Sequence, residues 1–273
     1  MVVTNKLTSL LKNVALVLYA AFALFPLLWM LLISFKFDRE MYDTVFVFTP
    51  TLENYRMLFS TGEYLGYFVN NVIVSVGAVL LSIAVGVPAA YALARFDFRG
   101  KENLAFTFLS FRFAPELLVI LPLFLIYQKI GLYDSYFGLI WVYQLISLPF
   151  IIWILRGYFE DISPEIEHAG RVDGYSWGHV FMKIMMPLVK PGMVAAGLLS
   201  FIFVWNNFTF ALLLAGQGIV TSTVASLKYI SSDTVHYGQM AAAVTLSALP
   251  EVILALLIQK HLVRGLSMGA VKG

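Results

Sequence analysis

The chain has 273 residues, of which 60% are hydrophobic and only 12% are charged. Soluble domains are about half apolar and about a quarter charged, so this chain has too few charged side chains to cover a soluble surface. The net charge of +2 is too small to indicate nucleic acid as a partner. The sequence has no cysteine, which excludes disulfides and thiolate metal sites, and no histidine or carboxylate cluster has the spacing of metal ligands.

Six segments are apolar enough to cross a bilayer, which takes about 20 apolar residues in a helix. They are residues 14–35, 69–94, 104–127, 136–155, 193–215 and 240–258. The first follows Lys6 and Lys12 and is longer than the apolar region of a secretory signal, so we expect it to stay in the mature protein. The pattern predicts an all-α membrane protein with six transmembrane helices, forming one domain over residues 1–273.

Lysine and arginine residues predict the orientation of these helices. If the N-terminus lies in the cytoplasm, most of them fall in the inner segments, as the usual excess of positive charge on that side requires. We therefore expect a multi-pass protein with both termini in the cytoplasm. The long segment between the fourth and fifth predicted helices, residues 156–192, is then cytoplasmic.

Part of this segment, residues 163–191, has a helical pattern of its own. Pro164 suits the first turn of a short helix, with Ser163 as its N-cap. Negative charge follows in the turn where the helix dipole favours it, from Glu165 and Glu167. The pair Asp173-Gly174 is typical of a turn, so we expect the short helix to end there.

A second amphipathic piece covers residues 177–185 and is expected to end before Pro187. The residues alone leave two interpretations of the whole loop. It lies on the membrane surface as an amphipathic segment, which its composition favours. Alternatively, it presents a short helix to a soluble partner.

The same loop resembles the EAA loop of ABC importer permeases, in which Glu-Ala-Ala is followed by three residues and then Gly. The Glu-Ala-Ala positions of this motif fall here on His168, Ala169 and Gly170. Histidine therefore replaces the glutamate, and glycine replaces the second alanine. Asp173 and Gly174 fit the pattern. Glu167 precedes the usual glutamate position by one residue and is a candidate substitute for it.

Further motifs match in order along nearly the whole chain and resemble the carbohydrate-uptake subfamily of maltose-system type. They are Asn70 and Asn71, residues 89–96, residues 98–100, Gly131 and Leu132, residues 148–150, residues 205–208, residues 263–266 and residues 269–273. Any one of these motifs is weak by itself. Together they are specific.

The resemblance implies a permease subunit that imports a sugar or sugar derivative by alternating access in the bacterial cytoplasmic (inner) membrane. It implies three protein partners beside membrane lipid: a second homologous permease, an ABC ATPase dimer and an extracytoplasmic solute-binding protein. The loop between the fourth and fifth helices would form a coupling helix that docks on the ATPase. The residues implied in docking are Glu165, Glu167, His168, Ala169, Gly170, Asp173 and Gly174.

The chain contains no G-x-x-x-x-G-K-[ST] sequence, the loop that holds nucleotide phosphates. ATP and magnesium are therefore expected in the partner ATPase, with no cofactor in this chain. No catalytic residues are predicted, and the chain is not expected to be an enzyme.

Polar residues inside spans are costly and usually face a cavity or another helix. Arg112 and Glu116 are four residues apart on one face of the third predicted helix, where they are placed to pair. The other candidates for a substrate pathway lie in the fifth and sixth helices: Trp205, Asn206, Asn207 and Glu251. Arg112 motivates the hypothesis that the sugar carries an anionic group, and a self-contained pair with Glu116 is the structural alternative.

The main competing interpretation is an ion-coupled secondary transporter. Such a protein needs inverted repeats or carboxylates near the membrane midplane. The sequence has no internal repeat, and Glu116 and Glu251 are weak evidence for ion coupling.

Overall fold

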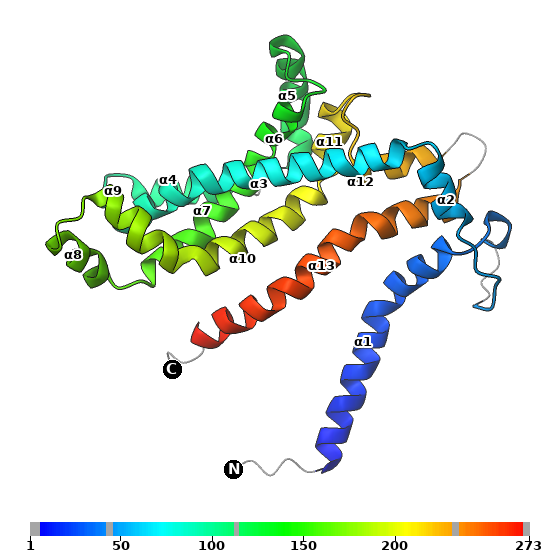
Figure 1. Cartoon of the computed structure of the whole chain (residues 1–273), viewed down its shortest axis with the longest axis horizontal. Helices are drawn as coiled ribbons and strands as arrows, with labels where there is room; N and C mark the ends of the chain where they lie inside the picture. The colour runs from blue at the N-terminus through cyan, green and yellow to red at the C-terminus, as the bar shows by residue number, and fades with distance from the viewer. Residues whose placement is uncertain (1–5, 42–45, 112–114, 231–234, 270–273) are drawn as a thin grey trace. The chain divides into compact units, whose positions relative to one another are not determined.

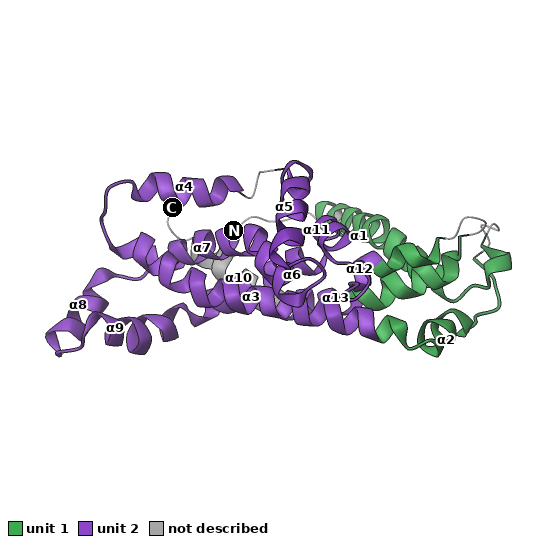
Figure 2. Ribbon diagram, turned by 90° about the horizontal axis from the view of Figure 1, so that it is seen from above, with its two compact units in different colours: residues 1–65, 225–248 green, residues 66–224, 249–273 purple. Residues whose placement is uncertain are grey.

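The structure is a computed structural model, and it describes residues 6–41, 46–111, 115–230 and 235–269 (Figure 1). These ranges form helices joined by turns, with one isolated β-bridge between Ile230 and Val235, so the prediction of an all-α protein is confirmed. The chain divides into two compact units, residues 1–65 with 225–248 and residues 66–224 with 249–273 (Figure 2). The single domain over residues 1–273 stays a prediction.

The first unit contains α1 (Lys6–Ser34), a 3-10 turn (Asp38–Glu40), α2 (Glu53–Ser60), a second 3-10 turn (Ser226–Tyr229) and the first turns of α13 (Tyr237–Gly269). The last carbonyls of a helix have no partner within it. At the end of α1 the side-chain amide of Asn54 is the hydrogen-bond donor to two carbonyls, those of Ser34 at 2.9 Å and Lys36 at 2.8 Å. The Tyr64 hydroxyl donates to the Ala243 carbonyl at 2.7 Å and fastens α13 within this unit.

The second unit holds most of the remaining helices. Their bounds are α3 (Glu63–Arg95, of which all but the first turn belongs here), α4 (Lys101–Phe111), α5 (Glu116–Ile130), α6 (Tyr136–Val142), α7 (Gln144–Glu160), α8 (Pro164–Val172), α9 (Trp177–Val180), α10 (Met186–Trp205), α11 (Thr209–Leu214) and α12 (Ser222–Ala225). The later turns of α13 also belong to this unit. Figures 1 and 2 place α8 and α9 beyond the C-terminal end of α3.

Two buried clusters hold the second unit together. One joins α3, α5 and α6 to the end of α10 and α11, and includes Val74, Ile120, Leu139, Val204 and Phe210. The other joins α3, α7 and the start of α10, and includes Val87, Tyr91, Leu155, Met185 and Val189. Small residues allow the helices to approach closely, as expected where packing rather than water drives helix association. A Cβ atom on Gly86 would lie 2.9 Å from Ile151, and one on Gly192 would lie 2.6 Å from the Tyr158 ring.

Four helices are long and apolar enough to cross a membrane: Thr8–Ser34, Glu63–Arg95, Trp177–Trp205 and Tyr237–Leu257. Two bent pairs pass the same test together, and each coincides with a predicted span. α4 and α5 meet at 88° where a single helix over residues 104–127 was expected, and α6 and α7 meet at 44° within the predicted span 136–155. Among the described residues the count is therefore four spans, or up to six if each bent pair is one span.

The bend between α6 and α7 has a visible cause. The side-chain amide of Gln144 donates to the carbonyls of Ile140 and Ala78 at 2.8 and 3.1 Å. In a regular helix each carbonyl accepts the backbone N–H of the residue four positions later. A side chain that takes the place of that N–H interrupts the pattern and bends the helix. Gln144 thus satisfies the carbonyl at the end of α6 and attaches the bend to α3.

The prediction that the second piece of the loop ends before Pro187 is wrong. The helix runs on from Trp177 through a π-helical segment, Phe181–Met185, into α10 and ends at Trp205, so the fifth helix begins well before residue 193. The N–H of Met186 donates to the Phe181 carbonyl, a bond from residue i+5 to residue i. This wider turn stands directly before Pro187, whose ring and missing N–H would otherwise break a regular α-helix.

Asp134 joins two distant loops of the second unit. It has a φ of 51°, a left-handed conformation that aspartate and asparagine tolerate better than most residues. One carboxylate oxygen accepts the N–H groups of Gly216 and Ile219, and the other accepts that of Gly218, each at 3.0 Å. The turn between α5 and α6 is thereby fixed to the loop after α11.

An Asp134→Ala substitution should lower the free energy of unfolding by about 3 kcal/mol, because it removes a charged acceptor shared by three N–H groups. Asp134→Asn should cost only about 1 kcal/mol, since the amide keeps one oxygen acceptor and tolerates the backbone conformation. Thermal unfolding of the purified variants in detergent measures both. A loss below about 0.5 kcal/mol for Asp134→Ala would show that the carboxylate oxygens do not hold the loop.

Candidate functional site

The loop between α7 and α9 forms the predicted short helix. α8 begins with Pro164 in its first turn and ends at Val172, and Ser163 occupies the N-cap position without a side-chain cap bond. The N–H of Tyr175 donates to the Gly170 carbonyl at 3.1 Å, which closes the helix end. Gly174 has a φ of 88°, a conformation that glycine adopts without strain.

α8 has one buried side and one exposed side. Glu167 and Gly170 are buried, and the remaining residues predicted for docking are exposed: Glu165, His168, Ala169, Asp173 and Gly174. Two apolar side chains, Ile166 and Val172, are exposed on the same helix. The exposed part of α8 is therefore mixed, with apolar side chains beside charged ones.

Glu167 points into the chain. Its side chain accepts a hydrogen bond from the Tyr91 hydroxyl at 2.7 Å and forms an ion pair with Nε of Arg95. Arg95 also donates through Nη2 to the Ile162 carbonyl at 2.6 Å. Tyr91 and Arg95 are one helical turn apart at the end of α3. This end of α3 therefore binds the chain at two points, at Ile162 just before α8 and at Glu167 within α8.

The partners of Glu167 were not predicted as site residues. Arg95 belongs to a motif, residues 89–96, that contributed only to the family resemblance. A tyrosine and an arginine spaced by four residues at the end of an apolar helix lie on one face, and this spacing is the sequence signal that indicates a shared ligand or partner.

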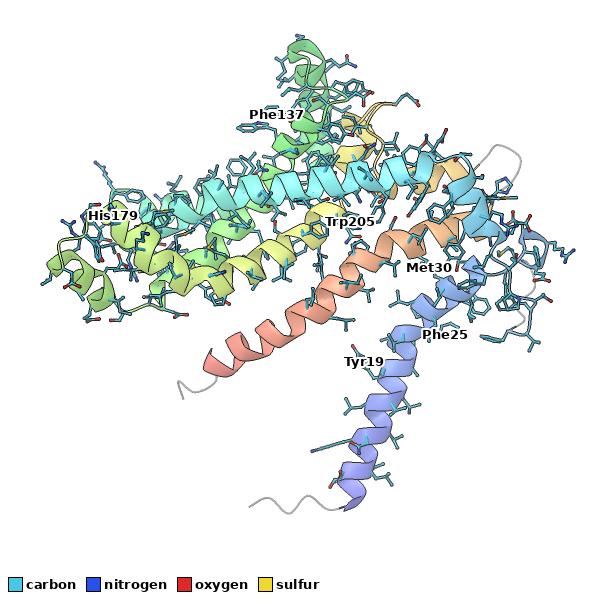
Figure 3. All side chains as sticks on the ribbon, in the orientation of Figure 1. Tyr19, Phe25, Met30, Phe137, His179 and Trp205 are labelled. Carbon is cyan, nitrogen blue, oxygen red and sulfur yellow. The ribbon has the colours of Figure 1, made fainter. Side chains whose placement is uncertain are left out.

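The buried side of α8 also packs on the helix that follows it. A Cβ atom on Gly170 would lie 2.6 Å from the Ile184 side chain and 3.3 Å from Val180. Trp177, at the start of α9, packs against the Phe96 ring, with 5.9 Å between the two ring centroids. The Arg171 guanidinium lies 5.1 Å from the centroid of the Trp177 ring. Figure 3 shows His179 at this end of the unit and Trp205 at the other end of the helix formed by α9 and α10. α8 is thus attached both to α3 and to the start of the long helix 177–205.

The second candidate region lies where α10 ends. The Asn207 side-chain amide donates to the Glu116 carboxylate at 2.9 Å, and its oxygen accepts the N–H of Phe210 at 3.1 Å. A cavity of about 520 Å³ opens beside this pair, and its wall includes Phe111, Phe203 and Phe210. The cavity therefore combines aromatic rings with one carboxylate and one amide. Arg112, the predicted partner of Glu116, lies outside the described residues.

The other predicted pathway residues do not line this cavity. Trp205 is only 1% exposed and packs against the rings of Phe68 and Phe201 (Figure 3). Asn206 is exposed and donates to the Ile202 carbonyl at 3.0 Å, and its side chain bonds to Glu251. The structure thus brings Glu116 and Asn207 together, and Asn206 and Glu251 form a separate pair.

No group of three histidine or carboxylate side chains is placed to hold a metal ion within the described ranges. The apolar helices and the bent pairs are the features of a multi-pass membrane protein, and the loop that contains α8 lies at one end of its second unit.

Comparison with known proteins gives the family. Residues 82–268 match the family described as binding-protein-dependent transport system inner membrane component. A trehalose transport system permease protein of Mycobacterium tuberculosis is 34% identical over 260 residues, covering 94% of this chain and 95% of that protein. A trehalose/maltose transport system permease protein of Thermococcus litoralis is 31% identical over 272 residues, covering 98% of each.

A solved structure has the same fold. It is that of a bacterial ABC transporter involved in the import of the acidic polysaccharide alginate, with a TM-score of 0.77 and 23% identity, and the match covers 93% of this chain and 96% of that one. The chain belongs to the family of binding-protein-dependent transport system inner membrane components. It is a multi-pass inner-membrane permease.

Proposed function

We propose that this chain is the permease subunit of an ATP-driven ABC importer that moves a sugar into the cytoplasm by alternating access. The observation that carries the proposal is α8, a short helix with an exposed side on which the residues of the EAA-like loop lie. The relatives named for trehalose and maltose support a sugar as the substrate. Alternating access needs an element with two discrete positions, and a helix fixed to the ends of two long helices suits that role.

The exposed side of α8 docks on the ATPase partner in this proposal. Glu165, His168 and Asp173 offer charged or polar contacts, and Ile166 and Val172 offer apolar ones. ATP and magnesium are bound and ATP is hydrolysed in that partner, so this chain supplies the pathway and no catalytic group. The other partners are a second homologous permease and an extracytoplasmic solute-binding protein, and both termini lie in the cytoplasm.

The cavity beside Glu116 and Asn207 favours an uncharged sugar. Glu116 is the one charged side chain among the described residues of its wall, and it would repel an anionic group. A carboxylate and an amide both accept hydrogen bonds from sugar hydroxyls, and the phenylalanine rings suit the apolar face of a sugar ring. The anionic sugar suggested by Arg112 is therefore not the substrate class that we propose.

The first experiment is to purify the tagged chain in mild detergent from its native host and to identify the proteins that accompany it. We expect an ATPase subunit and a second permease, and sugar uptake into vesicles that requires ATP. A Gly174→Val variant should lose the ATPase subunit, because a β-branched residue is strained at a φ of 88° and the end of α8 would unwind. Gly178→Val, at a position with open space around it, is the control.

The alternative is an ion-coupled secondary transporter, for which the intramembrane carboxylates Glu116 and Glu251 are the motivating residues. A chain that purifies alone and transports sugar without nucleotide, driven by an ion gradient, would establish that alternative. Uptake that stops when ATP is withheld while the ion gradient persists would exclude it.

A further inference from the structure

We infer that Glu167 is a positioning residue that fixes α8 to the end of α3, and that it does not contact the ATPase. Glu167, Arg95 and Tyr91 together form what is called here the α8 anchor. The inference rests on the proposed function for its role in transport. It also assigns the residues of the EAA-like loop to two different tasks, because Glu167 faces inward and the docking residues face outward.

Burial supports the assignment. Glu167 is 2% exposed, so no surface of this side chain remains for a partner. Both of its carboxylate oxygens are occupied, one by the Tyr91 hydroxyl and the other by Nε of Arg95. A contact between Glu167 and a docked protein would require both of these bonds to break.

The surroundings of the α8 anchor keep it rigid. The Tyr91 ring contacts the rings of Phe96, Phe159 and Phe181, with centroids 5.9, 5.3 and 4.9 Å apart. These rings exclude water, so loss of either charged partner would leave a buried charge uncompensated. The second bond of Arg95, to the Ile162 carbonyl, fixes the chain just before α8 begins.

The geometry gives α8 two attachments with different mechanical consequences. Through Glu167 it is fixed to α3, a helix of 33 residues. Through Gly170, which packs on Val180 and Ile184, it is fixed to the π segment and the start of α10. A push on the exposed side of α8 therefore reaches α3 directly through the α8 anchor, and the anchor links docking to the movement of that helix.

The first arm of the test uses the purified chain alone. Hydrogen exchange of residues 164–172 should become at least about tenfold faster in Glu167→Gln and in Arg95→Gln, because each breaks a buried pair. The exchange of α5 and α6 should not change. The exchanged pair Arg95→Glu with Glu167→Arg should restore most of the protection. Asp97→Asn is the matched control, since the Asp97 side chain is fully exposed and pairs only across 3.4 Å with Lys101.

The second arm uses the assembled importer. Glu167→Gln should still purify with the ATPase subunit, but its ATP hydrolysis should no longer respond to sugar-loaded binding protein. The exchanged pair should regain that response. Loss of the ATPase subunit together with unchanged exchange of α8 would overturn the inference, because it would make Glu167 a direct contact. If the native chain brings down no ATPase, the proposed function fails, and the first arm still decides whether the α8 anchor exists.

Discussion

An Asn207→Leu variant is expected to lose about 3 kcal/mol of its free energy of unfolding, since the asparagine holds two polar groups inside the membrane region. Its amide is the hydrogen-bond donor to Glu116, and its oxygen accepts the N–H of Phe210 at the start of α11. Asn207 is only 9% exposed, so water cannot easily take its place. Leucine would leave a carboxylate and an N–H group without partners, where unsatisfied groups are most costly.

Thermal unfolding in detergent measures this loss, and two further variants separate its causes. Asn207→Asp keeps the oxygen that caps α11 but places a second carboxylate beside Glu116, so it should also be destabilised, and less so at low pH. Asn103→Leu replaces an exposed asparagine of α4 and should change stability by no more than about 0.5 kcal/mol. Equal stability of Asn207→Leu and the native chain would mean that the pair with Glu116 contributes nothing.

A Gly192→Leu variant is expected to separate α7 from α10. A Cβ atom on Gly192 would lie 2.6–2.9 Å from three atoms of the Tyr158 ring, so even the first carbon of a side chain meets that ring. Overpacking at such a contact costs about 1–3 kcal/mol, and leucine should reach the upper end. The expected result is a lower unfolding temperature and weaker assembly with partner subunits, because the helix that carries α8 loses its support.

Gly157→Leu, on α7, is the matched control for this substitution. No atom lies within 4 Å of a Cβ atom built there, so leucine should be tolerated and gains helix propensity of about 1 kcal/mol over glycine. Adding Tyr158→Ala to Gly192→Leu should recover stability, because it removes the ring that the new side chain meets. A double variant no more stable than Gly192→Leu would show that the clash lies elsewhere.

The sequence predicted those parts of the site that depend on local signals. Pro164 and the Asp173-Gly174 pair delimit α8 because proline and glycine act on the backbone where they stand. The interior position of Glu167 was not predicted, since it depends on Tyr91 and Arg95, more than 70 residues away along the chain. No local pattern tells which carboxylate of a short helix faces inward.

Two other differences follow from helix continuity. A single helix over residues 104–127 was predicted, but α4 ends at Phe111, Glu116 is the first residue of α5, and the two helices meet at 88°. The pair of Arg112 with Glu116 stays a prediction, because Arg112 lies outside the described residues. The second difference concerns Pro187, before which a helix end was predicted because a proline normally ends a helix. The helix continues instead, because the π segment before the proline allows it to do so.

The π segment also sets how this chain tolerates insertions and deletions. An α-helix turns by about 100° for each residue, so an extra residue within a helix changes the direction in which everything before it emerges. The π segment already holds one residue more per turn than an α-helix, so deletion of one residue from Phe181–Met185 would restore a regular turn and leave the direction of α8 about the axis of α10 nearly unchanged. The ring of Pro187 would then meet the carbonyl four residues before it, as in any regular helix. Length variation among related chains that keep this proline should therefore be absent here and confined to the turns.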